Sequence, residues 1–163
     1  MLNIAIVVSE FNEEVTFRML DVAKEKANLM QLTISHVCMV PGAYDMPIVV
    51  DRLLQNENID GVATLGAIIK GQTKHDEVIS HATAQSLTSL SLKYQKPVSL
   101  GISGPGMQER HAYARIRPVA ERAIEALVKI SKELEKNSKM IQLSILKITE
   151  YGPWTLTLGS DRE

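Results

Sequence analysis

Gly71, Thr73 and His75 stand at alternate positions in a short segment that joins an apolar run to a long helical pattern. The free N–H groups of a helix's first turn bind anions, and glycine lets the backbone fold closely around such a ligand. Lys70 and Lys74 add positive charge to the same segment. The segment therefore predicts an anion site, although it is not a P-loop, because the Gly-Lys-Ser/Thr ending is absent.

His75 lies at the start of the helical pattern, close to the proposed anion. A helix N-terminus disfavours a positive charge, so the imidazole is expected to be neutral and able to accept a proton. An isolated histidine is more often an ordinary surface residue. Here a strand end, an anion loop and a histidine fall together, which favours a catalytic role. The other histidines and the single cysteine have no metal-ligand spacing, so the sequence predicts no metal site.

Two earlier segments carry further candidates. Phe11 follows the first apolar run, where its ring could cover a planar heterocycle, although its position alone favours a packing role. In the second segment, Gly42 and Ala43 are small and leave space for a ligand near the backbone. Asp45 could cap the next helix or accept hydrogen bonds from a polyol.

A fourth segment, 103–106, is a turn cluster of serine, glycine and proline, followed by a helical pattern rich in arginine. One of these guanidinium groups could hold a phosphate through paired hydrogen bonds, and the alternative for each is a solvated charge. The arginines are Arg110, Arg115, Arg117 and Arg122.

These segments alternate with elements that would position them. Short β-branched runs predict strands, and apolar residues at helical spacing predict helices, with Pro118 expected to kink or break the last one. The alternation predicts an α/β fold, a three-layer α/β/α sandwich with a four-stranded parallel sheet, whose ligands bind at the carboxyl ends of the strands. The expected strands are 3–8, 32–40, 61–66 and 97–102, and the expected helices are 15–30, 46–54, 75–94 and 108–136.

The last residues change character. Apolar and polar residues alternate over 140–150 and again over 154–158, with Tyr151-Gly152-Pro153 as a turn between them. This pattern fits a β-hairpin, and a poorly ordered terminus is an equal alternative. The sequence therefore predicts an α/β domain over 1–136 and a C-terminal extension over 137–163.

The composition excludes several classes of protein. The 163 residues are 45% hydrophobic and 23% charged, as in an ordinary globular protein. The net charge is -1, with no basic excess to attract nucleic acid or an anionic membrane. No apolar run approaches a membrane span of about 20 residues. A single cysteine suits a reducing compartment, so a cytoplasmic location is expected.

Three of these motifs, in this order, resemble the 6,7-dimethyl-8-ribityllumazine synthase family. They are Phe11-Asn12, the Pro-Gly-Ala-Tyr-Asp-Met-Pro segment at 41–47, and Gly66-x-x-Ile-x-Gly-x-Thr-x-His at 66–75. The Gly-Ile-Ser-Gly-Pro-Gly-Met stretch at 101–107 resembles the archaeal branch. The resemblance covers about residues 1–136 and implies a flavodoxin-like fold.

The resemblance implies an enzyme that condenses 5-amino-6-ribitylaminouracil with 3,4-dihydroxy-2-butanone 4-phosphate, releases phosphate and water, and needs no cofactor. It implies that His75 transfers protons and that Phe11 stacks on the pyrimidine. The ring and ribityl chain would also meet Ala43, Tyr44, Asp45, Ala67, Ile68, Ile69 and Leu100. The phosphate would meet Gln72, Thr73 and Arg115, with Arg110 as the alternative arginine.

Two of these positions depart from the family pattern. Asp45 stands where the family often has Glu, and Leu100 where many members have an aromatic residue on the second face of the ring. The resemblance further implies self-association into pentamer rings, some of them closed into icosahedral shells, with the site between neighbouring subunits.

Two other functions are the alternatives. An archaeal-type riboflavin synthase would act on the lumazine product, but it does not need the Gly-x-Thr-x-His loop. A non-catalytic flavodoxin-like binding module is the second alternative.

Overall fold

Strands and helices alternate along the chain, as the sequence predicts. The computed structural model describes residues 1–150, and describes side chains as far as residue 143. The elements are β1 (Asn3–Ser9), α1 (Glu13–Leu29), β2 (Thr33–Val40), the 3-10 turn η1 (Ala43–Asp45), α2 (Met46–Leu54), β3 (Gly61–Ile69), α3 (His75–Tyr94), β4 (Val98–Met107) and α4 (Glu109–Glu150).

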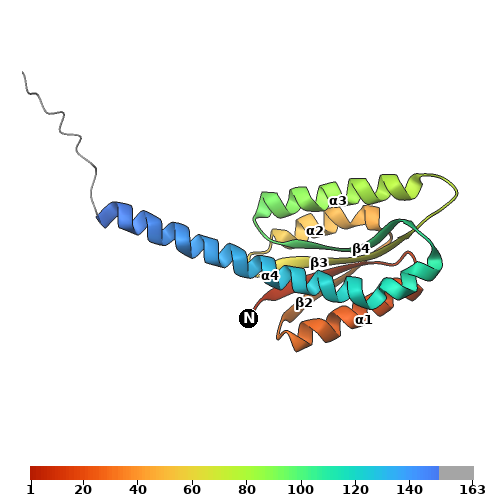
Figure 1. Cartoon of the computed structure of the whole chain (residues 1–163), viewed down its shortest axis with the longest axis horizontal. Helices are drawn as coiled ribbons and strands as arrows, with labels where there is room; N and C mark the ends of the chain where they lie inside the picture. The colour runs from red at the N-terminus through yellow and green to blue at the C-terminus, as the bar shows by residue number, and fades with distance from the viewer. Residues whose placement is uncertain (151–163) are drawn as a thin grey trace, which may run out of the picture. The chain divides into compact units, whose positions relative to one another are not determined.

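The four strands form one parallel sheet in the order β2-β1-β3-β4. The central strands β1 and β3 are buried along almost their whole length, which explains their continuous apolar sequences. Helices cover both faces, so the predicted three-layer α/β/α sandwich is confirmed (Figure 1). Within the described residues, no helix combines the length and the apolar character of a membrane span.

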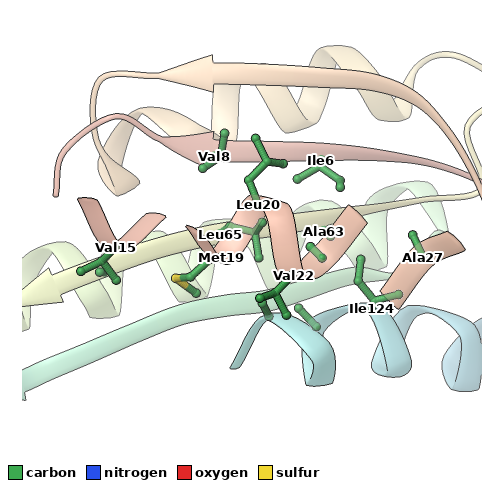
Figure 2. Close-up of a cluster of buried hydrophobic side chains, with 14 of the residues drawn as sticks. Ile6, Val8, Val15, Met19, Leu20, Val22, Ala27, Ala63, Leu65 and Ile124 are labelled. Atoms are coloured by element: carbon green, nitrogen blue, oxygen red, sulfur yellow. The ribbon is translucent and has the colours of Figure 1, made fainter. Parts of the chain in front are cut away.

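Two apolar clusters hold the layers together. One joins α1 and the first part of α4 to one face of the sheet, and Figure 2 shows Met19 and Val22 of α1 near Leu65 of β3 and Ile124 of α4. The other joins α2 and α3 to the opposite face, around Met46, Val50 and Leu87.

Helix α3 also carries polar contacts at its C-terminal end. Lys93 Nζ and Tyr94 Oη each donate to the Asp51 carboxylate of α2 at 2.9 Å, and Gln55 Nε2 donates to it at 2.8 Å. The hydrogen bonds from Lys93 and Tyr94 lower the pKa of the Asp51 carboxyl below its usual value. This cluster therefore links the end of α3 to the middle of α2.

The predicted turn at 103–106 is wrong, because these residues continue strand β4 to Met107. Ala67 pairs with Ser103 and Ile69 with Met107, so β4 has four steps where β3 has two. The extra residues form an irregularity inside the strand, and Gly104 (φ 111°) and Gly106 (φ 73°) supply the backbone conformations that it needs. Strand β3 likewise runs to Ile69, so Ala67–Ile69 belong to a strand and not to the predicted loop.

Helix α4 differs from its prediction in two ways. It continues through Pro118, so the predicted break is wrong. The carbonyl of Ala114, which loses its partner at Pro118, belongs to an exposed residue and can bond to water, while Ala112 and Ala120 pack on the core on either side.

The predicted strand at 140–150 is also wrong, because these residues are helical. Ile141, Ile145 and Ile148 also fit a helical spacing, and a helix already formed extends more easily than a new strand begins. The second half of the predicted hairpin, 154–158, lies outside the described residues.

The contacts divide the chain into one compact unit, Met1–Ser131, and a second that begins at Lys132. A domain boundary at 136 stays a prediction.

The close approach of β4 to β3 and α4 gives a testable prediction. A Cβ on Gly101 would lie 2.3 Å from the Thr64 carbonyl oxygen and 2.9 Å from Ala123 Cβ. Gly101→Ala should therefore lower the free energy of unfolding by about 1–3 kcal/mol. Chemical denaturation measures this change. Gly71→Ala is the control, because no atom lies within 4 Å of its added Cβ, and a loss as large in that variant would contradict the steric explanation.

Candidate active site

The carboxyl ends of β1, β2 and β3 surround a cavity of about 510 Å³. Its size fits a small-molecule site, and it lies where parallel sheets bind ligands. The last residues of β1 and β3 and the segments after all three strands contribute to it. They are Ser9, Phe11, Pro41, Gly42, Ala43, Tyr44, Asp45, Ala67, Ile68, Ile69, Gly71, Thr73, His75, Asp76 and Ile79.

The backbone of Phe11 is hydrogen-bonded to a neighbouring loop, and its side chain is exposed. Its N–H donates to the Pro41 carbonyl at 3.0 Å, and the N–H of Glu10 donates to Val40 at 2.8 Å, so the loops after β1 and β2 run together. The Phe11 side chain is 71% exposed beside the cavity. A packing role for this residue is therefore wrong, and the exposed ring is available to a ligand.

Strand β3 extends past its neighbour β1 on the cavity side. Among the described pairs, β1 meets β3 only as far as Leu65, whereas β3 runs to Ile69. The Nδ2 of Asn12 donates to the Ala67 carbonyl at 2.7 Å beyond that point. The backbone of the last β3 residues therefore lies at the cavity with no β1 residue paired to it. Such a free strand edge can form hydrogen bonds with a flat polar molecule, as it would with a neighbouring strand.

Tyr44 and Asp45 line the cavity from the segment after β2. Asp45 directly precedes α2 but makes no capping hydrogen bond, so the capping alternative is not realised. The carbonyl of the buried Ala43 accepts a hydrogen bond from Thr83 Oγ1 at 3.3 Å, which fixes this turn to α3. The two exposed side chains are therefore carried on a supported backbone and remain free to meet a ligand.

The loop between β3 and α3 presents Thr73 and His75 to the cavity, and both are exposed. Lys74, the residue before the helix, makes no side-chain capping bond, so that residue leaves the first-turn N–H groups open. A helix start in this condition attracts an anion. No group of three His, Cys, Asp or Glu residues in the described part of the chain is arranged to hold a metal ion.

Three of the predicted site residues do not line this cavity: Gln72, Leu100 and Arg115. Gln72 lies between two residues that do. Leu100 is 55% exposed and lines a separate hollow of about 180 Å³ with Ser80, His81 and Pro105. Arg115 and the alternative Arg110 are exposed on α4.

Sequence reasoning assigned no role to two residues that shape the site. Asn12 adopts the left-handed conformation (φ 62°) and bonds to a residue far along the chain. Asp76 lines the cavity while only 7% exposed. An acidic residue in a helix's first turn is common, so its sequence position alone carries no sign of this burial.

The two features of Asn12 can be separated by mutation. Asn12→Gly removes the bond to Ala67 but keeps a residue suited to the left-handed conformation, whereas Asn12→Ala also forces a less suitable residue into it, at about 1–2 kcal/mol. Both variants should be less stable than the parent, and Asn12→Ala the less stable of the two. Thermal and chemical unfolding measure the difference. Equal stability of the two variants would contradict the backbone argument.

Comparison with known proteins identifies the family. A family sequence model described as 6,7-dimethyl-8-ribityllumazine synthase matches residues 1–135, which include the predicted site residues. A protein of that name from Sulfolobus acidocaldarius is 48% identical over 135 residues, which is 83% of this chain and 85% of the relative. One from Staphylothermus marinus is 47% identical over 139 residues (83% and 93%). One from Methanocaldococcus jannaschii is 43% identical over 135 residues (83% and 95%). The chain therefore belongs to the 6,7-dimethyl-8-ribityllumazine synthase family.

Proposed function

We propose that this protein condenses 5-amino-6-ribitylaminouracil with 3,4-dihydroxy-2-butanone 4-phosphate to 6,7-dimethyl-8-ribityllumazine, releasing phosphate and water, in riboflavin biosynthesis. The observation that carries the proposal is the family match over residues 1–135, which includes each group the reaction requires. Those groups are an exposed aromatic ring, an open β3 edge, a helix start for phosphate and a histidine beside it.

The pyrimidine would stack on Phe11 and bond the backbone of Ala67, Ile68 and Ile69. This role is supported by the exposed ring and by the end of β3 beyond its last pair with β1. The ribityl chain would lie along Ala43, Tyr44 and Asp45, whose carboxylate can accept hydroxyl hydrogen bonds. Substrate binding in this way would bring the amine of the pyrimidine close to His75.

The butanone phosphate would bind at the start of α3, where the N–H groups of Gln72 and Thr73 meet it and the helix dipole stabilises its charge. His75 would then carry protons between the reacting carbon, nitrogen and oxygen atoms as phosphate and water leave. A fixed phosphate next to a base converts a reaction of two molecules into one between held groups.

Self-association would complete the site. Leu100 and Arg115 do not line the cavity of their own chain, which supports a site in which a neighbouring subunit supplies the second ring face and the phosphate arginine. A ring with head-to-tail contacts brings two different patches together in this way. We accordingly propose pentamer rings, alone or closed into icosahedral shells, in the cytoplasm, with residues 137–163 outside the chemistry.

Mixing the purified protein with both substrates should give a new absorbing and fluorescent product. A riboflavin synthase would instead consume added lumazine, and a binding module would form no product.

His75→Ala should lower kcat by a factor on the order of ten to a thousand, because acid–base residues contribute about that much. His36→Ala, an exposed histidine on β2, is the control and should match the parent. A His75→Ala enzyme with parental rates across pH 6–8 would reject His75 as the proton carrier.

Shared sites can be tested by refolding two crippled chains together. If His75→Ala and Arg115→Ala subunits mix at random in a ring, about a quarter of the sites receive both intact residues. Activity should then rise well above either parent, and separately refolded proteins mixed afterwards should show no gain. Arg110→Ala in place of Arg115→Ala tests the alternative arginine. Rings that contain both chains but keep the parents' mean activity would place the whole site in one subunit.

A further inference from the structure

The loop that carries Thr73 and His75 is held at both ends by two consecutive residues of β4. At one end, the N–H of Lys70 donates to the Met107 carbonyl at 2.8 Å. At the other, the N–H of Gly106 donates to Asp76 Oδ2 at 2.9 Å. The last residues of β4 therefore fix the positions of both ends of this loop.

The two hydrogen bonds differ in kind. The Lys70 bond joins backbone to backbone and exists for any residue types. The bond at the α3 end depends on one side chain, that of Asp76, which is 7% exposed. A buried carboxylate is tolerated only with hydrogen-bond donors, so Asp76 and the Gly106 N–H need each other.

The partner of Asp76 lies in a segment that also touches the cavity. A Cβ on Gly104 would lie 2.3 Å from the carbonyl oxygen of Ile68, a cavity residue, so this segment packs directly on the end of β3. Gly106 has no such crowding but requires glycine through its φ of 73°. The segment thus connects the β3 end of the site to the first turn of α3.

We infer that Asp76 is a positioning residue for the reaction, acting through the first turn of α3. By fixing that turn to Gly106, it sets where the His75 side chain and the phosphate-binding N–H groups stand relative to the cavity. This inference rests on the proposed function. It assigns to Asp76 the acceptor oxygen of its carboxylate and no chemical step.

The test compares three variants. Asp76→Asn keeps an oxygen that can accept the Gly106 N–H, and it should stay within about twofold of the parent in kcat/KM. Asp76→Ala removes the acceptor, and a misplacement of about 1 Å can cost a hundredfold. We expect Asp76→Ala to lose roughly ten- to a hundredfold in kcat/KM, with a higher KM for the butanone phosphate. Asp76→Ser is a second truncation, used if the alanine variant does not fold.

Asp60→Ala is the matched control. Its Oδ2 also accepts a backbone N–H from a distant residue, that of Asn3 at 2.7 Å, but it lies just before β3 at the opposite end of the strand from the cavity. This variant should lower the melting temperature without changing either KM. A similar rise in KM in Asp60→Ala would show that general destabilisation explains the effect.

Two readouts besides activity separate the outcomes. Amide hydrogen exchange over residues 103–107 should accelerate in Asp76→Ala alone, and inorganic phosphate, followed by calorimetry, should bind that variant more weakly. If kcat/KM falls as far in Asp76→Asn as in Asp76→Ala, the effect depends on the charge of the carboxylate and not on its acceptor oxygen, and the inference is wrong. It is also wrong if Asp76→Ala matches the parent. If the parent forms no lumazine, the proposed function fails, while exchange and phosphate binding still decide whether Asp76 positions the loop.

Discussion

Burial of the two central strands on both faces is the constraint on which the rest of the molecule depends. Nearly every residue of β1 and β3 is enclosed between helices, and each of these strands pairs with a neighbour on both sides, β3 as far as Leu65 on the β1 side. No ligand can enter such a sheet. Chemistry is therefore confined to the edge where the strands end, and the cavity forms where β3 passes the last residue of β1. The same burial leaves the polar groups of the site to be oriented from loops.

The sequence allowed the order of elements, the layers and most of the cavity to be predicted, because each depends on local patterns. β-branched runs such as Ile4–Val8 predict buried strands, and the Gly71, Thr73 and His75 spacing falls at a strand-to-helix junction. Gly104 and Gly106 misled the prediction, since glycine serves a strand irregularity as well as a turn. The apolar residues after Met140 likewise fit both the spacing of a strand and that of a helix, and they are helical because they extend α4.

The contacts that position the site had no local signature. Asn12 and Ala67 are 55 residues apart, and Asp76 and Gly106 are 30 residues apart. Each pair joins one side chain to a backbone group whose location depends on the finished sheet. Leu100 and Arg115 likewise do not line the cavity of their own chain, and no local pattern in the sequence indicates this.

Helix α3 has an unusual balance of contacts for an element that carries the site. Its buried residues are one large apolar side chain, Leu87, and the polar Thr83 and Asp76, while Ile79, Leu90 and Tyr94 are only partly buried against the core. Single polar contacts are spread along it: Asp76 joins it to β4, Thr83 joins it to the turn before α2, and the Asp51 cluster joins it to α2. An element with little buried apolar area opens at a free energy below that of global unfolding. In an isolated subunit, α3 would therefore open on heating before α1, which buries seven residues, and the site would be lost while β1 and β3 still hold the sheet together.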